Sequence, residues 1–252
     1  MEKEQLLVSI VIPAYNAEKY IEKTVRSVLR QTYIDYEIVI VDDCSSDKTY
    51  SIVQDLAQED KRIKCYQNEK NQGVANTRNY AIAQSKGKYI ALLDADDIWV
   101  ETKLEKQIKL LQETKAQIAY CSYAFIDEKD KEILKPFIVP VTTTYKSTLA
   151  KSVISCSTAM VEKKLFETYE FEAGVYHEDY VLWLKMLKDG VKAVGDREVL
   201  AYYRFMEGTR SANKINSAMK RWQVYRKSMK MSLLESVVAM IQYVINGLLK
   251  YS

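Results

Sequence analysis

The first 97 residues alternate between short apolar runs and amphipathic stretches. Four apolar runs have the length and residue types of buried strands: Leu6 to Ile12, Glu37 to Val41, Ile63 to Gln67 and Tyr89 to Leu93. Between them, apolar residues recur at helical spacing, as at Ile21 and Val25, and we expect Asn16 to cap that first helix. Strands that alternate with helices form a parallel sheet, so the sequence predicts a Rossmann-like α/β fold.

Acidic residues follow the fourth apolar run at the end of the strand where α/β folds bind ligands. This run leads directly into Asp94-Ala95-Asp96-Asp97. An isolated Asp-x-Asp is weak evidence, but three neighbouring acids repel one another and require a cation or a basic partner in a partly dry cleft. Alternate residues of an extended segment point the same way, so we expect Asp94 and Asp96 to hold one Mg²⁺ or Mn²⁺ that neutralises a diphosphate.

Two further charged positions in this half allow two interpretations each. Asp42 and Asp43 follow the second strand, where short acids commonly stabilise turns. Because that strand end lies near the other acidic one, Asp43 could instead accept a hydrogen bond from the imino group of uracil or thymine. Arg78 lies near the start of a helix predicted from about Val74 to Ser85. It is either an ordinary solvated helix charge or a group that faces phosphates.

Glu178 and Asp179 precede an apolar run with helical spacing. Acids are favourable at helix N-termini, so capping is one interpretation. The functional alternative is general-base catalysis, in which a carboxylate takes the proton of an acceptor hydroxyl as its oxygen attacks. The adjacent His177 is the only histidine, which excludes any site that needs two, and we interpret it as structural.

Composition narrows the class of protein. The 252 residues are 48% hydrophobic, enough for a substantial core, and a net charge of +3 is too small to indicate nucleic acid as the main partner. The four cysteines are widely spaced and form no CxxC pair, so we expect reduced thiols rather than a zinc site. The charged N-terminus and the lack of an apolar stretch of about 20 residues predict a cytoplasmic chain without a signal peptide or membrane span.

The second half of the chain has a less regular pattern. We predict a helix from about Glu101 to Thr114, strand-like pieces near Gln117 to Phe125 and Val153 to Met160, and a late strand from Val199 to Phe205. No linker rich in Gly, Pro or Ser separates the two halves, so we predict a single domain. The segment from Met206 to Lys214 is either a mobile loop in which Arg210 contributes charge, or a simple connection to the C-terminal helices.

The C-terminal segment carries a broad apolar stripe at helical spacing. It is formed by Leu233, Leu234, Val237, Val238, Ile241, Val244, Ile245, Leu248 and Leu249. Basic residues lie just before it, at Lys220, Arg221, Arg226, Lys227 and Lys230. This amphipathic extension either lies on an anionic membrane surface with the basic residues near the headgroups, or packs against the catalytic core or another subunit.

Together these motifs resemble the family 2 glycosyltransferases, inverting enzymes of the GT-A fold that use nucleotide-sugar donors. The matching motifs occur in the family's order, at Val8 to Asn16, Val41 to Ser45, Asn71 to Asn79, Asp94 to Asp97 and His177 to Tyr180. They cover roughly the first 205 residues, and the joint pattern is far more specific than any single motif.

The resemblance implies a role for each matched residue on the donor side. Pro13, Tyr15 and Asp43 would help to hold the nucleotide. Arg78 would lie near the phosphate-binding region, and Asp94 would contact the donor.

The resemblance also implies the chemistry. Asp96 would bind the divalent metal, Mn²⁺ or Mg²⁺, which stabilises negative charge on the leaving diphosphate. Asp179 would be the catalytic base that removes a proton from an acceptor hydroxyl. That hydroxyl attacks the anomeric carbon from the face opposite the nucleoside diphosphate, so the configuration inverts.

Within the family, the chain is similar to short bacterial enzymes that build teichuronic acid, capsule or O-antigen repeat units. Their acceptors are often saccharides on a polyprenyl diphosphate lipid. Ala218 stands where the QxxRW pattern of processive members has Gln before Arg221-Trp222, which favours addition of a single sugar. We therefore expect transfer of one hexose or N-acetylhexosamine from a UDP-sugar, by a cytoplasmic enzyme that is peripheral on the inner face of the cell membrane.

This interpretation also predicts how the chain is divided. Residues 1–215 would form the GT-A domain, with a nucleotide-sugar half in residues 1–97 and an acceptor and catalytic-base half in residues 98–215. Residues 216–252 would form the helical extension. The alternatives are a non-catalytic nucleotide-binding scaffold, transfer of a deoxysugar from a dTDP donor, and a sugar-phosphate nucleotidyltransferase. An oxidoreductase is disfavoured because no GxGxxG follows the first strand.

Overall fold

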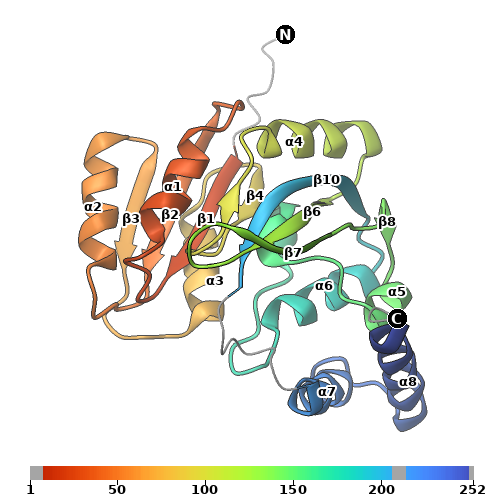
Figure 1. Cartoon of the computed structure of the whole chain (residues 1–252). Coiled ribbons are helices and arrows are strands. Elements are labelled where there is room, and N and C mark those ends of the chain that lie inside the picture. Colours follow the sequence, from red (N-terminus) through yellow and green to blue (C-terminus); the bar gives the residue numbers. More distant parts are fainter. Residues whose placement is uncertain (1–7, 206–213, 250–252) are drawn as a thin grey trace.

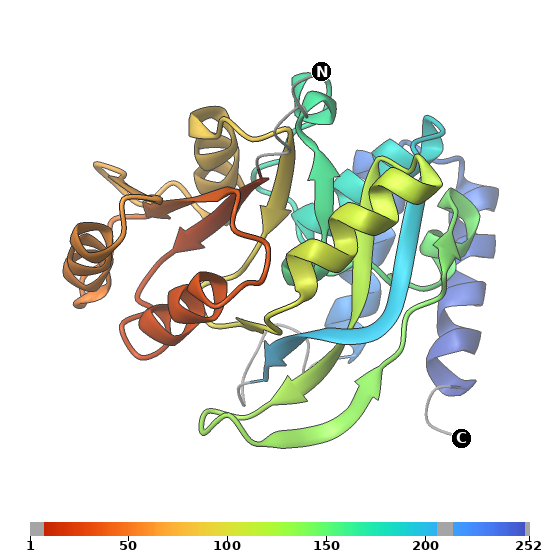
Figure 2. The same cartoon turned by 90° about the horizontal axis from the view of Figure 1, so that it is seen from above.

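The computed structural model describes residues 8–205 and 214–249 (Figures 1 and 2). Its strands are β1 (Val8–Ala14), β2 (Tyr36–Asp42), β3 (Ile63–Gln67), β4 (Tyr89–Leu92), β5 (Ile98–Trp99), β6 (Ile118–Ile126), β7 (Glu132–Phe137), β8 (Thr142–Thr143), β9 (Met160–Glu162) and β10 (Ala193–Arg204). Its α-helices are α1 (Ile21–Leu29), α2 (Thr49–Glu59), α3 (Val74–Gln84), α4 (Lys103–Thr114), α5 (Tyr145–Ala150), α6 (Glu178–Lys188), α7 (Lys214–Gln223) and α8 (Leu233–Leu249). Shorter helical turns are η1 (Cys156–Thr158), η2 (Lys163–Glu167) and η3 (Val224–Ser228).

The strands form one sheet in the order β3-β2-β1-β4-β9-β6-β10-β5, with β7 paired to β6 and β8 paired to β10. Strands β3, β2, β1 and β4 run parallel to one another, and β6 is parallel to β10. The short β9 lies antiparallel between β4 and β6. This confirms the predicted mostly parallel α/β sheet. Because the carboxyl ends of β1, β2 and β4 meet at one edge, the acids that follow β2 and β4 lie at the same edge of the sheet.

Helices cover both faces of this sheet, as Figure 2 shows for α1 and α4 on one side and α3 on the other. The alternation of side chains along β1 explains both layers. Ile10 and Ile12 lie in one core cluster with residues of α1, α2 and α4, whereas Val11 lies in a second cluster with residues of α3 and α6. Strands that are buried on both faces read as continuous apolar runs, which is why the first four strands could be predicted from sequence.

Three local predictions are wrong. Asn16 does not cap α1, which begins at Ile21 after Tyr20; instead Asn16 has a positive φ of 48° and its side-chain oxygen accepts the backbone N–H of Ser46. The expected strand near Val153 to Met160 is irregular apart from the short helical turn η1, and the short β9 begins only at Met160. The Asp94–Asp97 segment is a tight turn closed by a hydrogen bond from the Asp97 N–H to the Asp94 carbonyl, not an extended continuation of β4.

The C-terminal elements pack on the outer side of α6 (Figure 1). A third core cluster joins Tyr180 and Leu184 of α6 to Tyr225 of η3 and Ala239 of α8. Arg221, which the membrane interpretation placed near headgroups, is buried instead and donates to the Tyr180 hydroxyl at 2.8 Å. Within residues 8–205 and 214–249, no helix combines the length and the hydropathy that crossing a bilayer requires. The predicted loop from Met206 falls on residues 206–213, outside the described residues.

Candidate active site

A cavity of about 900 Å³ lies at the carboxyl edge of the sheet. Six of the seven predicted site residues line it: Pro13, Tyr15, Arg78, Asp94, Asp96 and Asp179. They come from the end of β1, from α3, from the turn after β4 and from the first turn of α6. The fold therefore brings together acids that are more than 80 residues apart in sequence, as one site with carboxylates on two walls.

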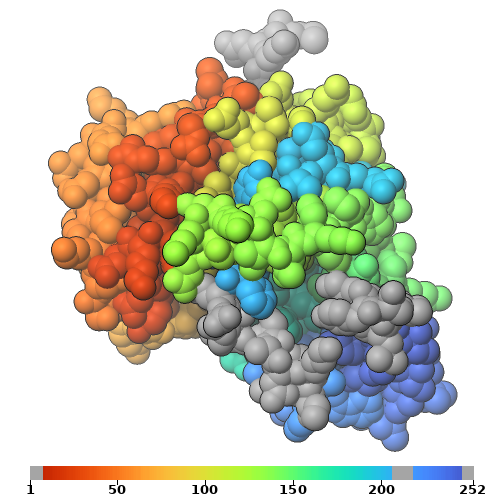
Figure 3. All heavy atoms as spheres, viewed as in Figure 1, coloured from red at the N-terminus to blue at the C-terminus, as the bar shows by residue number. Residues whose placement is uncertain are grey.

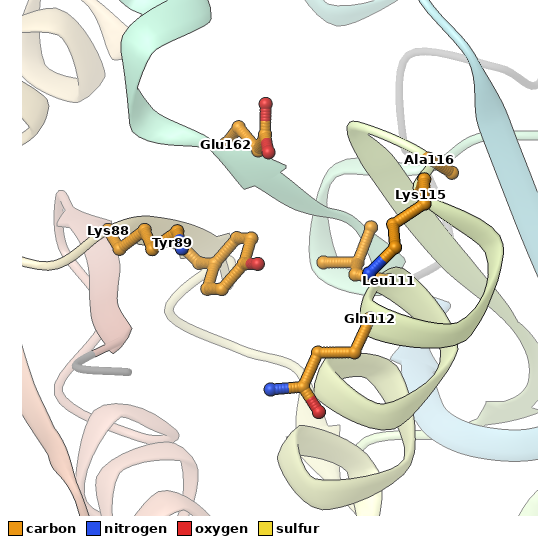
Figure 4. Close-up of a pocket in the computed structure, with 7 residues that line it drawn as sticks. All are labelled: Lys88, Tyr89, Leu111, Gln112, Lys115, Ala116 and Glu162. Atoms are coloured by element: carbon orange, nitrogen blue, oxygen red, sulfur yellow. The ribbon is translucent and has the colours of Figure 1, made fainter. Parts of the chain in front are cut away.

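A smaller cavity of about 410 Å³ lies between Lys88 and Tyr89 on one side and the end of α4 on the other (Figure 4). Lys115 and Glu162 supply its remaining charges. None of the predicted site residues, all of which the structure describes, lines this cavity. We assign it no role in the chemistry.

Arg78 links the two acidic walls of the large cavity. Its guanidinium donates from Nη2 to Asp94 Oδ1 at 2.6 Å and from Nη1 to Glu178 Oε1 at 2.7 Å. Arg78 is only 4% exposed, so the interpretation as a solvated helix charge is wrong. A planar fork with fixed donors can satisfy two carboxylates at once, which a lysine ammonium does less well. Arg78 thus fixes the first turn of α6 relative to the turn that follows β4.

The three acids after β4 have separate environments. Asp94 is engaged by Arg78, while the buried Asp97 accepts the backbone N–H of Arg204 at 2.8 Å. Burial, with Asp96 next in importance, raises the pKa of Asp97 well above its ordinary value. Asp96 is half-buried on the cavity wall, and burial followed by the charge of Asp94 raises its pKa to about 6. Asp96 is therefore the acid of the three that a cation in the cavity would stabilise most directly.

Asp179 lies in the first turn of α6 and lines the same cavity. Burial, and secondly the neighbouring Glu178 carboxylate, raise its pKa to about 6. A carboxylate with a raised pKa accepts a proton more readily, which suits a general base that works near neutral pH. Beside it, His177 has a positive φ of 57° at the position preceding α6, and its ring packs on Tyr176. His177 also lines the large cavity, so its structural interpretation stays a prediction.

Asp43 does not line the cavity, although it lies at the same edge of the sheet. It is only 2% exposed, and its carboxylate accepts the side-chain amide of Asn68 and the backbone N–H groups of Gln72 and Gly73, each at 2.8 Å. These contacts hold the loop that precedes α3. The structure thus gives Asp43 the role of fixing a loop, in line with the turn interpretation. Contact between Asp43 and a nucleotide base stays a prediction.

Tyr15 differs from Asp43 because its ring is 53% exposed at the rim of the cavity. Its neighbour Asn16 is tied to the loop after β2, since the Asn16 N–H donates to Ser45 Oγ at 2.9 Å. The backbone that carries Tyr15 is therefore held in place while its aromatic face is open. Such a face suits stacking with a planar base.

The match to a family model extends over residues 9–169, and the model is described as Glycosyl transferase family 2. The chain belongs to this family. It is 36% identical to TuaG of Bacillus subtilis over 97% of both chains, and TuaG is named for teichuronic acid biosynthesis. It is 38% identical to WfaP of Escherichia coli, named UDP-Glc:alpha-D-GlcNAc-diphosphoundecaprenol beta-1,3-glucosyltransferase, over 97% of this chain and 95% of WfaP.

The fold agrees with that of a solved structure. Residues 1–349 of S. aureus TarS in complex with UDP-GlcNAc superpose with a TM-score of 0.75 at 20% identity, covering 94% of this chain and 71% of the TarS chain. This confirms the predicted GT-A fold with its C-terminal helical extension. Family membership identifies the chain as a glycosyltransferase, which excludes the nucleotidyltransferase and oxidoreductase alternatives.

The sequence did not reveal one residue that shapes the site of this family 2 glycosyltransferase. Arg204, the last residue of β10, is 2% exposed, and its guanidinium donates to the carbonyls of Asp96 and Asp127 and to the Asp130 carboxylate. It also stacks over the Tyr20 ring at 4.5 Å. Arg204 therefore joins the acidic turn to the β6–β7 hairpin. No spacing rule marks it, because its partners lie 74 to 108 residues away.

We expect Arg204→Lys to destabilise the fold by about 2–3 kcal/mol, because a lysine leaves several buried acceptors without donors. The catalytic rate should also fall, because the Asp96 carbonyl loses its hydrogen bond from the Arg204 guanidinium. Thermal unfolding and transfer rates measure the two effects. Arg26→Lys is the matched control, because the ion pairs of Arg26, with Glu22 and Glu59, are exposed and the change should cost less than about 0.5 kcal/mol. Equal stability of the two variants would contradict the role of Arg204.

The raised pKa of Asp179 predicts a pH dependence for transfer. A base acts only when it is deprotonated, so the rate should fall about tenfold for each pH unit below about 6. If the base had the ordinary pKa of a carboxylate, the rate would begin to fall only near pH 4. Initial transfer rates between pH 4.5 and 8, at saturating donor, provide the measurement. A rate that stays constant down to pH 5 would show that Asp179 does not titrate as the structure indicates.

Proposed function

We propose that this glycosyltransferase transfers one hexose or N-acetylhexosamine, with inversion, from a UDP-sugar to a saccharide acceptor in bacterial surface polysaccharide biosynthesis. The observation that carries the proposal is the convergence of Asp94, Asp96 and Asp179 on one cavity. The name of TuaG supports the pathway class, and the name of WfaP supports a UDP-hexose donor and a polyprenyl diphosphate-linked acceptor.

The residues present fit a divalent metal held in part by the donor. Within the described residues, no group of three or more His, Cys, Asp or Glu side chains is arranged to hold a metal ion. Mg²⁺ and Mn²⁺ do not need such a cage, because they bind through one or two carboxylates together with substrate phosphates and water. Asp96 would supply the main protein ligand. When bound, the metal would neutralise charge on the leaving diphosphate.

The other residues have roles that follow from their positions. Tyr15 would stack on the base, Pro13 would border it, and Asp43 would keep the adjoining loop in place. Asp94, oriented by Arg78, would contact the donor sugar or phosphates. Asp179 would take the proton from the acceptor hydroxyl as that oxygen attacks the anomeric carbon.

The same arrangement supports the predicted division of the chain. Residues 1–97 would hold the nucleotide-sugar, and residues 98–215 would supply the catalytic base and the acceptor site. Residues 216–252 would form an extension. With a lipid-borne acceptor, the enzyme would work at the inner face of the membrane.

The donor is identified by thermal stabilisation with UDP, dTDP, GDP and ADP, each with and without Mn²⁺. A ligand that binds only the native state raises its stability, by about 2.7 kcal/mol at a hundred times its Kd. We expect a selective, metal-dependent shift with UDP, followed by sugar release from the matching UDP-sugar in an acceptor screen. A shift with dTDP alone would favour the deoxysugar alternative. Nucleotide binding without any transfer would favour the scaffold.

Asp96→Asn tests the metal assignment. Removing the carboxylate charge should weaken Mn²⁺-dependent binding of UDP at least about tenfold, while UDP binding without metal changes little. Isothermal calorimetry at fixed Mn²⁺ measures both. An Mn²⁺ dependence identical to that of the unaltered protein would remove Asp96 from the metal site.

A further inference from the structure

Helix α8 exposes its large apolar side chains instead of burying them. Leu233, Leu234 and Ile241 are 62%, 75% and 54% exposed. The others on this stripe are also exposed, at Val237, Val238, Val244 and Ile245. At 100° per residue these seven positions fall within one continuous face of the helix. A contiguous exposed apolar face of this kind on a protein surface marks an interaction site.

The opposite side of α8 attaches it to the protein mainly through small or polar groups, with Met240 as a partly buried apolar contact. Ser236 and Ala239 are buried, and the Tyr243 ring lies 4.3 Å from the Arg221 guanidinium. In an amphipathic helix that only completes a core, the large apolar residues would face inward. Here the side of α8 that faces the protein already makes its packing contacts. The exposed apolar face is therefore available for another partner. Figures 1 and 2 both show α8 at the edge of the molecule, on the side away from β3.

The charge next to this face indicates its partner. Residues 214–232 contain six basic residues and no Asp or Glu. Arg226, Lys227 and Lys230 are exposed directly before Leu233, and the Arg226 guanidinium contacts the Met231 carbonyl. Two copies that met through this face would bring like charges together. A basic rim beside an apolar face instead matches an anionic lipid surface, in which the side chains enter the acyl boundary and the cations meet headgroups.

The same basic segment also reaches the active site. The Lys220 ammonium lies 3.6 Å from the centre of the Tyr176 ring, and Tyr176 lines the large cavity. Helix α7 thus connects the cavity to the start of α8. A surface bound by α8 would lie next to the cavity that receives the acceptor.

We propose that α8 docks this enzyme on an anionic lipid surface through Leu233, Leu234, Ile241 and the rest of the exposed stripe, with Arg226, Lys227 and Lys230 at the headgroups. A benefit of docking for catalysis depends on the proposed function, because it requires the lipid-linked acceptor. The docking itself does not depend on that acceptor. Docking confines the enzyme and the acceptor to one surface, which raises the effective acceptor concentration.

The test is sedimentation of the full chain with vesicles of phosphatidylglycerol and phosphatidylcholine, compared with vesicles of phosphatidylcholine alone. We expect binding to the anionic vesicles that weakens as salt is raised. Ile241→Glu should lower this binding at least about tenfold. The neighbouring Gln242→Glu is the matched control, because it adds the same charge one position along, on the polar edge of the helix, and should change binding less than about twofold. Both positions are exposed, so both variants should melt like the unaltered protein.

Three outcomes would overturn the docking proposal. These are absence of vesicle binding, equal losses in the two variants, and a dimer in sedimentation velocity that Ile241→Glu dissociates, which would assign the face to a second copy. Transfer to a short-chain, water-soluble acceptor separates this proposal from the proposed function. If the unaltered protein transfers sugar to this acceptor but binds no vesicles, the proposed function stands and the docking proposal is wrong. If the unaltered protein binds anionic vesicles but transfers no sugar, the docking proposal stands and the proposed function is wrong.

Discussion

Asp179→Asn is expected to lower the rate of sugar transfer by about 10³-fold, because a positioned general base contributes about 10²–10⁴ and the amide cannot accept the proton. The side chain keeps its size, so the Kd for UDP with Mn²⁺ should change less than about threefold. Stopped-time transfer assays and calorimetry measure the two quantities. Asp189→Asn, at the exposed far end of the same helix, is the control and should keep full activity.

Asp179→Asn is expected to raise the stability of the fold at pH 8 although it lowers the activity. The pKa of Asp179 is raised from 3.8 to about 6 in the folded protein. The fold therefore favours the protonated form, and the stability that this contributes is present below pH 4 and lost as the pH rises through 6. At pH 8 the neutral Asn removes a half-buried charge, so its melting temperature should be higher, by at most a few degrees, than that of the unaltered protein. Retained transfer, or a lower melting temperature at pH 8, would contradict the assignment of Asp179.

Arg78→Met is expected to destabilise the protein by about 3–5 kcal/mol, since it leaves the Asp94 and Glu178 carboxylates without their buried partner. Transfer should be lost as well, because the first turn of α6 is no longer fixed to the turn after β4. Arg78→Lys restores the charge but not the fork, and we expect it to recover less than half of the lost stability. Urea unfolding of the three proteins provides the comparison.

Lys23→Met is the matched control for Arg78→Met. Lys23 of α1 pairs at 2.6 Å with Asp130, which lies between β6 and β7. Figure 3 shows the β6–β7 segment, in green, covering this face of the molecule beside the N-terminal part of the chain, in red. Its side chain is 59% exposed, so losing the pair should cost less than about 1 kcal/mol. Full recovery of stability in Arg78→Lys would show that charge alone, rather than bridging geometry, holds the two walls together.

The acidic walls could be predicted because they depend on local patterns and on one topological rule. An apolar run followed by acids is visible in sequence at Tyr89–Asp97, and a parallel sheet brings such ends to one edge. The partners of Arg78 and Arg204 could not be predicted in the same way. Each guanidinium pairs across long stretches of chain, and a buried arginine and a solvated one look alike in sequence.

The errors at Asn16 and in the C-terminal segment have a similar origin. Asn16 has the composition of a helix cap, but tertiary contact with the loop after β2 determines its conformation. The periodicity of α8 predicted an apolar stripe without saying which side faces the protein. The structure shows that packing uses Ser236, Ala239 and, in part, Met240, so this face packs on the protein, whereas contact of the exposed apolar face with a membrane stays a proposal.

The most direct test of the proposed function is the anomeric configuration of the transferred sugar. The enzyme is incubated with Mn²⁺, an α-configured UDP-sugar and a saccharide diphosphate carrying a short lipid, and the product linkage is determined by NMR. Single displacement assisted by Asp179 predicts one added sugar with a β-linkage. An α-linked product would contradict the proposed reaction, because it requires a second displacement or front-face attack that the proposed role of Asp179 does not provide.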